Sequence, residues 1–288
     1  GSADIIIGSP LDDEYTASGY KGNSGNVALF LGGFSDETYD NNDADDEVHG
    51  DSANDWFGYR VLMVDLNDDG YDDILATSPY NDDVSNQGGA IYGFLGSAAP
   101  SWSGDAQDEA DMEIYGDVNG LSLGFNGIPN PGDNDGDGRL DLMLYNEASG
   151  DAWLWLEAGS LSGAYDISDA DHLFAGVDGD YASAVESSTD LDGDGDDEIV
   201  IGADSDDTAG TDRGGVFRYD YDATWGATLG TKDASAVIWG VQDGDYLGTG
   251  ISGGADLDAD GKEDLLIGAV GSDSGATDGG GLFFVPGW

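Results

Sequence analysis

The chain contains no cysteine, so neither disulfide bonds nor thiol chemistry can contribute to its stability or activity. Lys and Arg together number only 7 against 61 Asp and Glu, which leaves a net charge of −54. A field of this sign makes nucleic acids and anionic membrane surfaces poor partners. No stretch approaches eighteen apolar residues in a row, so we expect no insertion into a membrane.

The chain does contain one nine-residue acidic run in four copies, at 65–73, 133–141, 190–198 and 256–264. Each copy has oxygen-bearing side chains at positions 1, 3, 5 and 9, a Gly at position 6, and an apolar run directly after it. Calcium prefers six to eight oxygen ligands, and the Gly permits the sharp turn that brings them together. The sequence therefore predicts about four Ca²⁺ sites.

In each predicted site the backbone carbonyl of position 7 adds to the four side-chain ligands. The predicted metal-site residues are Asp65, Asn67, Asp69, Tyr71, Asp73, Asp133, Asp135, Asp137, Arg139, Asp141, Asp190, Asp192, Asp194, Asp196, Glu198, Asp256, Asp258, Asp260, Lys262 and Asp264. Asn67 at position 3 and Glu198 at position 9 depart from the common pattern. The longer Glu198 side chain puts the geometry of the third loop in question.

Other readings of the loop fit less well. An EF-hand requires a bidentate carboxylate at position 12, whereas position 12 is apolar in all four copies: Ala76, Leu144, Ile201 and Ile267. Magnesium rarely uses an all-protein cage, and zinc is disfavoured because there is no Cys and both His lie outside the loops. The remaining alternative is a solvated acidic turn that binds nothing tightly.

The loops begin at residues 65, 133, 190 and 256, so the chain repeats roughly every 60 residues. Each repeat contains four short apolar or Gly-containing segments separated by turn residues, which predicts four strands. The strand after each loop is continuously apolar and is therefore expected to be buried on both faces, as in the packed blades of a propeller.

We therefore predict an all-β fold, a single β-propeller domain over 1–288 with about five four-stranded blades. The terminal blades are expected to have about three strands each. The predicted repeat units are 1–50, 51–116, 117–176, 177–240 and 241–288.

These segments resemble the FG-GAP repeats of the integrin α-subunit head and of many bacterial secreted proteins. The resemblance lies in Trp56-Phe57-Gly58 and in the elements Gly8-Ser9-Pro10, Thr77-Ser78-Pro79 and Gly202-Ala203-Asp204. Tyr145-Asn146 and Tyr181-Ala182 depart from the pattern. The resemblance implies a propeller fold and bound calcium, and it says much less about function.

The N-terminus aligns with the end of a further loop, with Gly1 at position 6 and Asp4 at position 9, which predicts a partial fifth site. Two explanations fit. The chain is a segment of a longer protein, or another copy supplies the missing strands, because open strand edges accept foreign strands and so permit self-association.

The charge adds an environmental expectation. Four calcium ions would neutralise only a small part of −54, and repulsion on this scale opposes folding unless counter-ions screen it. In about 1 M salt the Debye length falls to roughly 3 Å. We therefore expect an extracellular or cell-surface prokaryotic protein in a saline or calcium-rich environment. The alternative is Asp filling turns, which it suits.

No catalytic site is apparent, because His49 and His172 occupy corresponding strands away from any candidate nucleophile. The sequence favours a non-enzymatic, calcium-stabilised structural or adhesive module, such as a surface or filament subunit, with a protein or glycan partner. One alternative is a lectin-like propeller in which Trp102 and Trp225, predicted in loops, contact sugars. Another is the non-catalytic propeller of a larger secreted enzyme.

Overall fold

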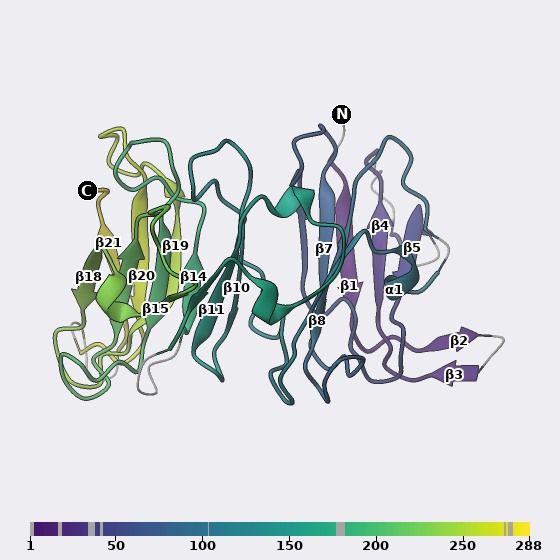
Figure 1. Ribbon diagram of the computed structural model, residues 1–288, viewed down its shortest axis with the longest axis horizontal. Coiled ribbons are helices and arrows are strands. Elements are labelled where there is room, and N and C mark those ends of the chain that lie inside the picture. The colour runs from purple at the N-terminus through teal and green to yellow at the C-terminus, as the bar shows by residue number, and fades with distance from the viewer. Residues whose placement is uncertain are drawn as a thin grey trace. The chain divides into compact units, whose positions relative to one another are not determined.

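The computed structural model describes residues 3–16, 19–33, 38–40, 43–102, 104–176, 182–273, 275 and 279–288. The predictions for Gly1 and Tyr181 lie outside the described residues. Within them, regular structure is almost entirely β (Figure 1), which confirms the all-β prediction. The contacts divide the chain into two compact units, Gly1–Ile128 with Ser160–Asp169, and Pro129–Gly159 with Ala170–Trp288.

The first unit contains two sheets and a small ribbon. One sheet has the strand order β1-β4-β5, and its antiparallel strands are β1 (Ile5–Ser9), β4 (Asn26–Phe30) and β5 (Asp46–His49). The ribbon pairs β2 (Glu14–Thr16) with β3 (Gly19–Lys21) and projects beyond that sheet (Figure 1).

The second sheet of this unit contains an antiparallel run of four strands and one added edge strand. The four are β6 (Val61–Val64), β7 (Asp73–Ser78), β8 (Ala90–Phe94) and β9 (Met112–Tyr115). The edge strand β12 (Gly163–Asp166) joins β9 in parallel. A one-turn helix, α1 (Ala106–Glu109), precedes β9.

The second unit contains three sheets. The first has the order β10-β11-β13-β17, with β10 (Leu142–Asn146), β11 (Asp151–Trp155), β13 (His172–Phe174) and β17 (Thr228–Leu229). The next comprises β14 (Ala184–Glu186), β15 (Ile199–Ala203), β16 (Gly215–Tyr219) and β18 (Ala236–Trp239). The last comprises β19 (Leu247–Ala255), β20 (Asp264–Ala269) and β21 (Gly281–Val285). Short 3₁₀ helices are η2 (Ala158–Ser160), η3 (Ile167–Asp169) and η4 (Thr231–Asp233).

Each predicted repeat unit supplies the principal strands of one sheet. The first and last sheets have three strands, as expected for the terminal units. These sheets are those of the predicted propeller blades, whereas the unit boundaries and the single domain over 1–288 remain predictions.

The third repeat differs from the prediction of four strands. Among the described residues no strand forms before its loop, around Leu123–Phe125. Pro129 and Pro131 lack the backbone N–H that a strand interior needs. Leu123 keeps the bridge to Gly89 of the preceding repeat, and β17 from the following repeat joins the sheet of β10, β11 and β13 in parallel.

The inner strands are buried on both faces, as the continuously apolar runs predict. Every residue of β7, β8, β15 and β16 is buried. In the second unit Met143, Leu154 and Phe174 pack against Ile201 and Phe217 of the next sheet. Face-to-face packing of sheets therefore forms the core, and both ends of these strands are left for loops.

In the second and fifth repeats the residue at the Phe position of the Phe-Gly element bridges to the preceding sheet. Phe57 forms a parallel bridge with Gly25, and Leu247 forms the same bridge with Gly214. Both glycines have positive φ, +88° at Gly25 and +73° at Gly214. A Cβ on Gly214 would lie 2.2 Å from the Leu247 carbonyl oxygen. Only glycine permits this close approach.

Gly214→Ala should therefore destabilise the protein by at least about 2 kcal/mol, because the substitution forces both backbone strain and a clash. Gly226→Ala is the matched control, since its Cβ would meet nothing within 4 Å. Denaturant unfolding measures both. Equal stabilities for the two variants would contradict the role assigned to the bridge.

Candidate calcium loops

The four acidic loops share one backbone geometry. Loops 65–73, 190–198 and 256–264 each connect the first two strands of a sheet, and loop 133–141 directly precedes β10. In every loop the position-1 carboxylate accepts the N–H of the position-6 glycine, at 2.9 Å for Asp65, 2.9 Å for Asp133, 3.1 Å for Asp190 and 3.0 Å for Asp256. The glycines at position 6 have φ between +87° and +102°, so the turn depends on their conformational freedom.

Positions 5 and 3 of the loops also accept backbone N–H groups. The position-5 carboxylates, Asp69, Asp137, Asp194 and Asp260, each accept the N–H of position 7. The position-3 oxygens of Asn67, Asp135 and Asp258 accept the N–H of position 5. Alternate side chains therefore turn into the loop, as the sequence predicts.

Position 9 is the buried end of each loop. Asp73, Asp141 and Asp264 are at most 1% exposed. One oxygen of each accepts the position-2 N–H, at 3.0, 2.9 and 2.6 Å. The other accepts an N–H from beyond the following strand, Gly96, Glu157 and Gly287 respectively. This carboxylate therefore joins the loop to the second and third strands of its sheet.

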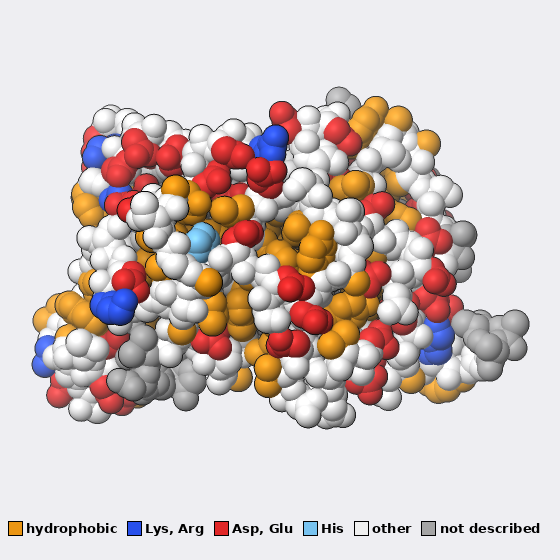
Figure 2. Space-filling view, in the orientation of Figure 1, with side chains coloured by type: hydrophobic (Ala, Val, Ile, Leu, Met, Phe, Trp, Pro, Cys, Tyr) orange, Lys and Arg blue, Asp and Glu red, His pale blue; other side chains and the backbone are white. Residues whose placement is uncertain are grey.

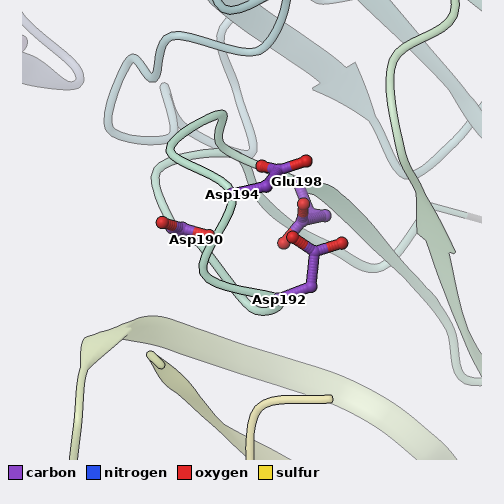
Figure 3. A group of neighbouring side chains, drawn as sticks. All are labelled: Asp190, Asp192, Asp194 and Glu198. Atoms are coloured by element: carbon purple, nitrogen blue, oxygen red, sulfur yellow. The ribbon is translucent and has the colours of Figure 1, made fainter. Parts of the chain in front are cut away.

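Carboxylates converge in three of the loops. The groups whose ligand oxygens all lie within 4.8 Å are Asp133, Asp135 and Asp141; Asp190, Asp192, Asp194 and Glu198; and Asp256, Asp258 and Asp264. The first loop, with Asn67 at position 3, forms no such group among the described residues. Figure 3 shows the four acids of the third loop gathered around a single turn of the chain.

The structure brings together positions 1, 3 and 9 of the second and fourth loops, and leaves Asp137 and Asp260 outside those groups. Oδ1 of Asp133 is buried without a hydrogen-bond partner among the described residues. A buried carboxylate oxygen with no donor is costly, and a hard cation would satisfy it. The residues of these two loops therefore fit calcium.

The other predicted positions are also accounted for. The position-7 side chains lie at the surface of their loops: Tyr71 is 45% exposed, and Arg139 pairs with Glu157. Asp4, the predicted partial fifth site, accepts the N–H of Gly32 at 2.5 Å. It thereby links the start of β1 to the residues after β4.

Burial raises the pKa of the innermost acids. The pKa of Asp141 rises to about 7, mainly because the carboxyl is removed from water, and that of Asp73 rises for the same reason. Neighbouring acids raise both further. A cation offsets this cost by favouring the charged form.

Adjacent loops of the second unit are hydrogen-bonded to one another. Asp197, at position 8 of the third loop, accepts the N–H of Asp133 at 2.9 Å and donates its own N–H to the Asp133 carbonyl at 2.8 Å. Glu263, at position 8 of the fourth loop, makes the same pair with Asp190, both at 3.0 Å. The position-8 residue of each of these two loops therefore holds the position-1 Asp of the loop before it.

A second acidic group escaped the sequence reasoning. It lies in the first unit, in the turns after β5 and β7, at the opposite end of β7 from loop 65–73. Nδ2 of Asn81 donates to Asp55 at 3.2 Å, Asp83 at 2.9 Å and the Tyr92 hydroxyl at 3.2 Å. The signal was available, because Asp55 precedes the Phe-Gly element by two residues as Asp245 precedes Leu247.

The tryptophans divide differently from the prediction. Trp153 is 6% exposed and lies in the core. Trp225 is half-buried against Phe174 and Tyr219, so it also packs on the core. Trp102 packs edge-on against Phe94 and lines a cavity of about 320 Å³ together with Asp4, Leu31 and Tyr71, among others.

Half-buried and exposed aromatic side chains gather at one end of the first unit. Trp56 packs on Tyr80, and Tyr59 stacks on Phe125 with ring centroids 5.1 Å apart. Arg60 lies over the Tyr59 ring. Phe125 is 38% exposed. Trp56 and Tyr59 flank Phe57-Gly58 before β6, and Tyr80 follows β7. The aromatic cluster therefore lies at the end of the sheet away from loop 65–73.

The described residues contain no helix long and apolar enough to cross a membrane. The FG-GAP repeat model matches residues 57–94, which run from Phe57 through the first loop to the end of β8. Integrin alpha-5 of Xenopus laevis is 26% identical over 234 residues, covering 76% of this chain and 20% of the integrin. The chain thus spans about a fifth of that relative, and both matches confirm the resemblance drawn from the motifs.

The second acidic group predicts a pH dependence. Burial, and then Asp83 and Asp82, raise the pKa of Asp55 to about 7, so the folded state keeps a proton that the unfolded chain releases near its ordinary value. Stability from this group is full below about pH 4 and is lost as the pH rises to about 7. Asp55→Asn should therefore raise the free energy of unfolding at pH 8 by roughly 1 kcal/mol more than at pH 5.

Denaturant titrations at the two pH values measure this difference. Asp108→Asn is the control, because this exposed carboxylate makes no comparable contacts. An equal gain at both pH values for Asp55→Asn would contradict the buried proton.

Proposed function

We propose that this FG-GAP, integrin α-like β-propeller is a calcium-stabilised extracellular module with a structural or adhesive role. The proposal rests on one hydrogen-bond pattern that recurs in all four loops, in which the position-1 carboxylate accepts the N–H of the position-6 glycine. This pattern turns acidic side chains into each loop. Such a loop places like charges together, and a positive charge beside them favours their ionised form at neutral pH. The converging ligand residues of loops 133–141 and 256–264 are the ones that would hold it.

Calcium, when bound, would supply the positive charge that offsets the carboxylate repulsion. The chain's own residues do the rest. Asp73, Asp141 and Asp264 transmit the order of the loop to the ends of the neighbouring strands through two N–H bonds each. Binding free energy at the loops then contributes to folding free energy.

We place the partner surface at the end of the β6–β9 sheet that lies away from loop 65–73. The aromatic cluster of Trp56, Tyr59, Tyr80 and Phe125 offers large, rigid contact area, and Arg60 adds a positive charge beside it. Aromatic and Arg side chains dominate protein interfaces energetically. We therefore assign contact with a protein partner at the cell surface to this cluster.

The charge supports an extracellular setting. On the face shown in Figure 2, acidic side chains outnumber the scattered Lys and Arg. Repulsion of this size is best tolerated where salt or calcium is plentiful. A saline or calcium-rich exterior of a prokaryotic cell is our proposal for the source environment.

A non-catalytic role is part of the same proposal. Nδ1 of His172 donates to the Gly226 carbonyl at 3.0 Å and the ring packs edge-on against Trp225, while His49 lies 3.4 Å from Glu47. The contacts of both histidines are those of side chains that support the sheets. The alternative of a non-catalytic propeller within a larger secreted enzyme is compatible with the same chain.

A lectin-like function is the second candidate, and the cavity beside Trp102 favours it. An indole ring, a phenol and a carboxylate of Asp4 or Asp72 around a space of about 320 Å³ match the needs of a sugar. Self-association is a further proposal. No described strand pairs with the outer edge of β21, where Leu282 is 70% exposed, and open edges accept strands.

Removing calcium should lower the melting temperature strongly. Each site that is saturated at 100 times its dissociation constant contributes about 2.7 kcal/mol to stability. Thermal unfolding in excess calcium and in EDTA measures the difference, with magnesium as the control cation. Light scattering of the same samples reports self-association. An unchanged melting temperature in EDTA would refute the calcium role.

Retention of cells on a surface coated with the protein separates the two candidate functions. The adhesive proposal predicts retention in calcium that Tyr80→Ala reduces severalfold and Trp102→Ala leaves intact. The lectin proposal predicts the reverse, together with competition by soluble glycans. Melting temperatures of both variants control for folding, and loss with neither variant contradicts both assignments.

A further inference from the structure

The third loop, 190–198, has the largest group of converging acids, yet a side chain of the protein already supplies its cation. Arg218 lies in the middle of β16, and the residue is 5% exposed. Its Nη2 lies 2.5 Å from Oδ2 of Asp192 and 3.6 Å from Oε1 of Glu198. These are positions 3 and 9 of the loop, so one guanidinium nitrogen lies between two predicted calcium ligands.

The rest of the guanidinium is also held. Nε donates to Asp220 at 2.6 Å, and Nη1 donates to the Trp288 carbonyl at 2.7 Å. The Trp288 ring lies over the group at 5.3 Å from its centroid. Burial alone would lower the pKa of Arg218, but Glu198, Asp220 and Asp192 outweigh it and raise the pKa. The cation is therefore fixed and permanently charged.

The corresponding positions in the other sheets carry no charge. Counting from the first residue of the strand, Arg218 of β16 matches Gly93 of β8, Leu154 of β11 and Phe284 of β21. Arginine on this strand therefore occurs only opposite the third loop, which is also the only loop with Glu at position 9. The two departures from the repeat belong together.

The hydrogen bonds of the third loop differ accordingly. Oε2 of Glu198 accepts the position-2 N–H of Leu191 at 2.5 Å, as the Asp carboxylates do in the other loops. Oε1 of Glu198 faces Arg218. The corresponding oxygen of Asp73, Asp141 and Asp264 accepts a backbone N–H from beyond the next strand. Asp192 likewise turns one oxygen to Arg218, whereas Asn67, Asp135 and Asp258 accept the position-5 N–H.

A calcium ion coordinated by Asp192 and Glu198 would lie about 2.4 Å from their oxygens, which is the region that Nη2 occupies. Two cations cannot share that space, because their repulsion at such distances is large and Arg218 is held in place by Asp220 and the Trp288 carbonyl. Oδ1 of Asp192 is buried without a hydrogen-bond partner among the described residues, as Oδ1 of Asp133 is, but here Arg218 already supplies a positive charge to the same carboxylate. The third loop as it stands therefore does not fit a calcium ion between Asp192 and Glu198.

We propose that Arg218 closes the third loop in place of a divalent cation, so that this loop keeps its shape without metal. The inference rests on calcium binding by the other loops, as set out under the proposed function. Asp197 and Glu263 then connect a permanently ordered loop to loops 133–141 and 256–264 on its two sides. The metal-free loop holds Asp133 in place for its neighbour before calcium arrives.

Calcium counting on the full chain by isothermal titration tests the proposal with matched variants. Asp194 and Asp260 hold the same position in the third and fourth loops and accept the same N–H bond, which Asn can still accept. Asp260→Asn should weaken one site at least tenfold or remove it. Asp194→Asn should leave the number and affinity of the sites unchanged.

A loss at Asp194→Asn equal to that at Asp260→Asn would overturn the proposal. Arg218→Leu, which installs the residue found at Leu154, should add one calcium site, and a second substitution of Asp194 should remove it again. If the unmodified chain binds no calcium, the calcium function is wrong. Arg218→Leu separately tests whether Arg218 replaces a cation in the third loop. A gained calcium site supports this role, and no gain overturns it. Should Arg218→Leu not fold, the matched Asn pair decides.

Discussion

The buried carboxylate at position 9 of each loop is the contact on which the sheets depend. It is the first residue of the second strand in β7 and β20, it closes the loop through the position-2 N–H, and it reaches the end of the third strand through its other oxygen. Removing it would leave two buried N–H groups without acceptors, a cost of about 1–3 kcal/mol for each group. The same burial makes the carboxylate costly to ionise, which is why a nearby positive charge matters so much.

The repeats satisfy this requirement in two ways. Loops 133–141 and 256–264 gather three acids, and we propose that a calcium ion supplies the positive charge there. The third loop gathers four and meets a guanidinium from its own sheet. An arginine is always present but fixed in strength, whereas an ion makes stability responsive to the surroundings. A chain with a net charge of −54 has only seven basic residues that could supply such a charge. It uses one of them, Arg218, at the third loop.

Much of the fold was predictable because its signals are local. The loop spacing, the apolar runs of β7 and β15 and the three-stranded terminal sheets all follow from residues close in sequence. Arg218 was not predictable from the loop motif, because it comes from β16 and reaches the loop only through strand pairing. The missing strand of the third repeat was signalled by Pro129 and Pro131, but the regular repeat outweighed them. Asp55 was hidden because burial, and not composition, makes it unusual.

The residue at position 8 of the loops has a wider consequence. Asp197 and Glu263 each offer a carboxylate to the preceding loop, but the second loop has Leu140 at that position, and an apolar side chain cannot accept an N–H. Loops 133–141, 190–198 and 256–264 therefore form one hydrogen-bonded series, which starts at the loop with Leu140. A change that loosens one loop of this series removes a hydrogen-bond partner from its neighbour, so we expect the three loops to order and loosen together.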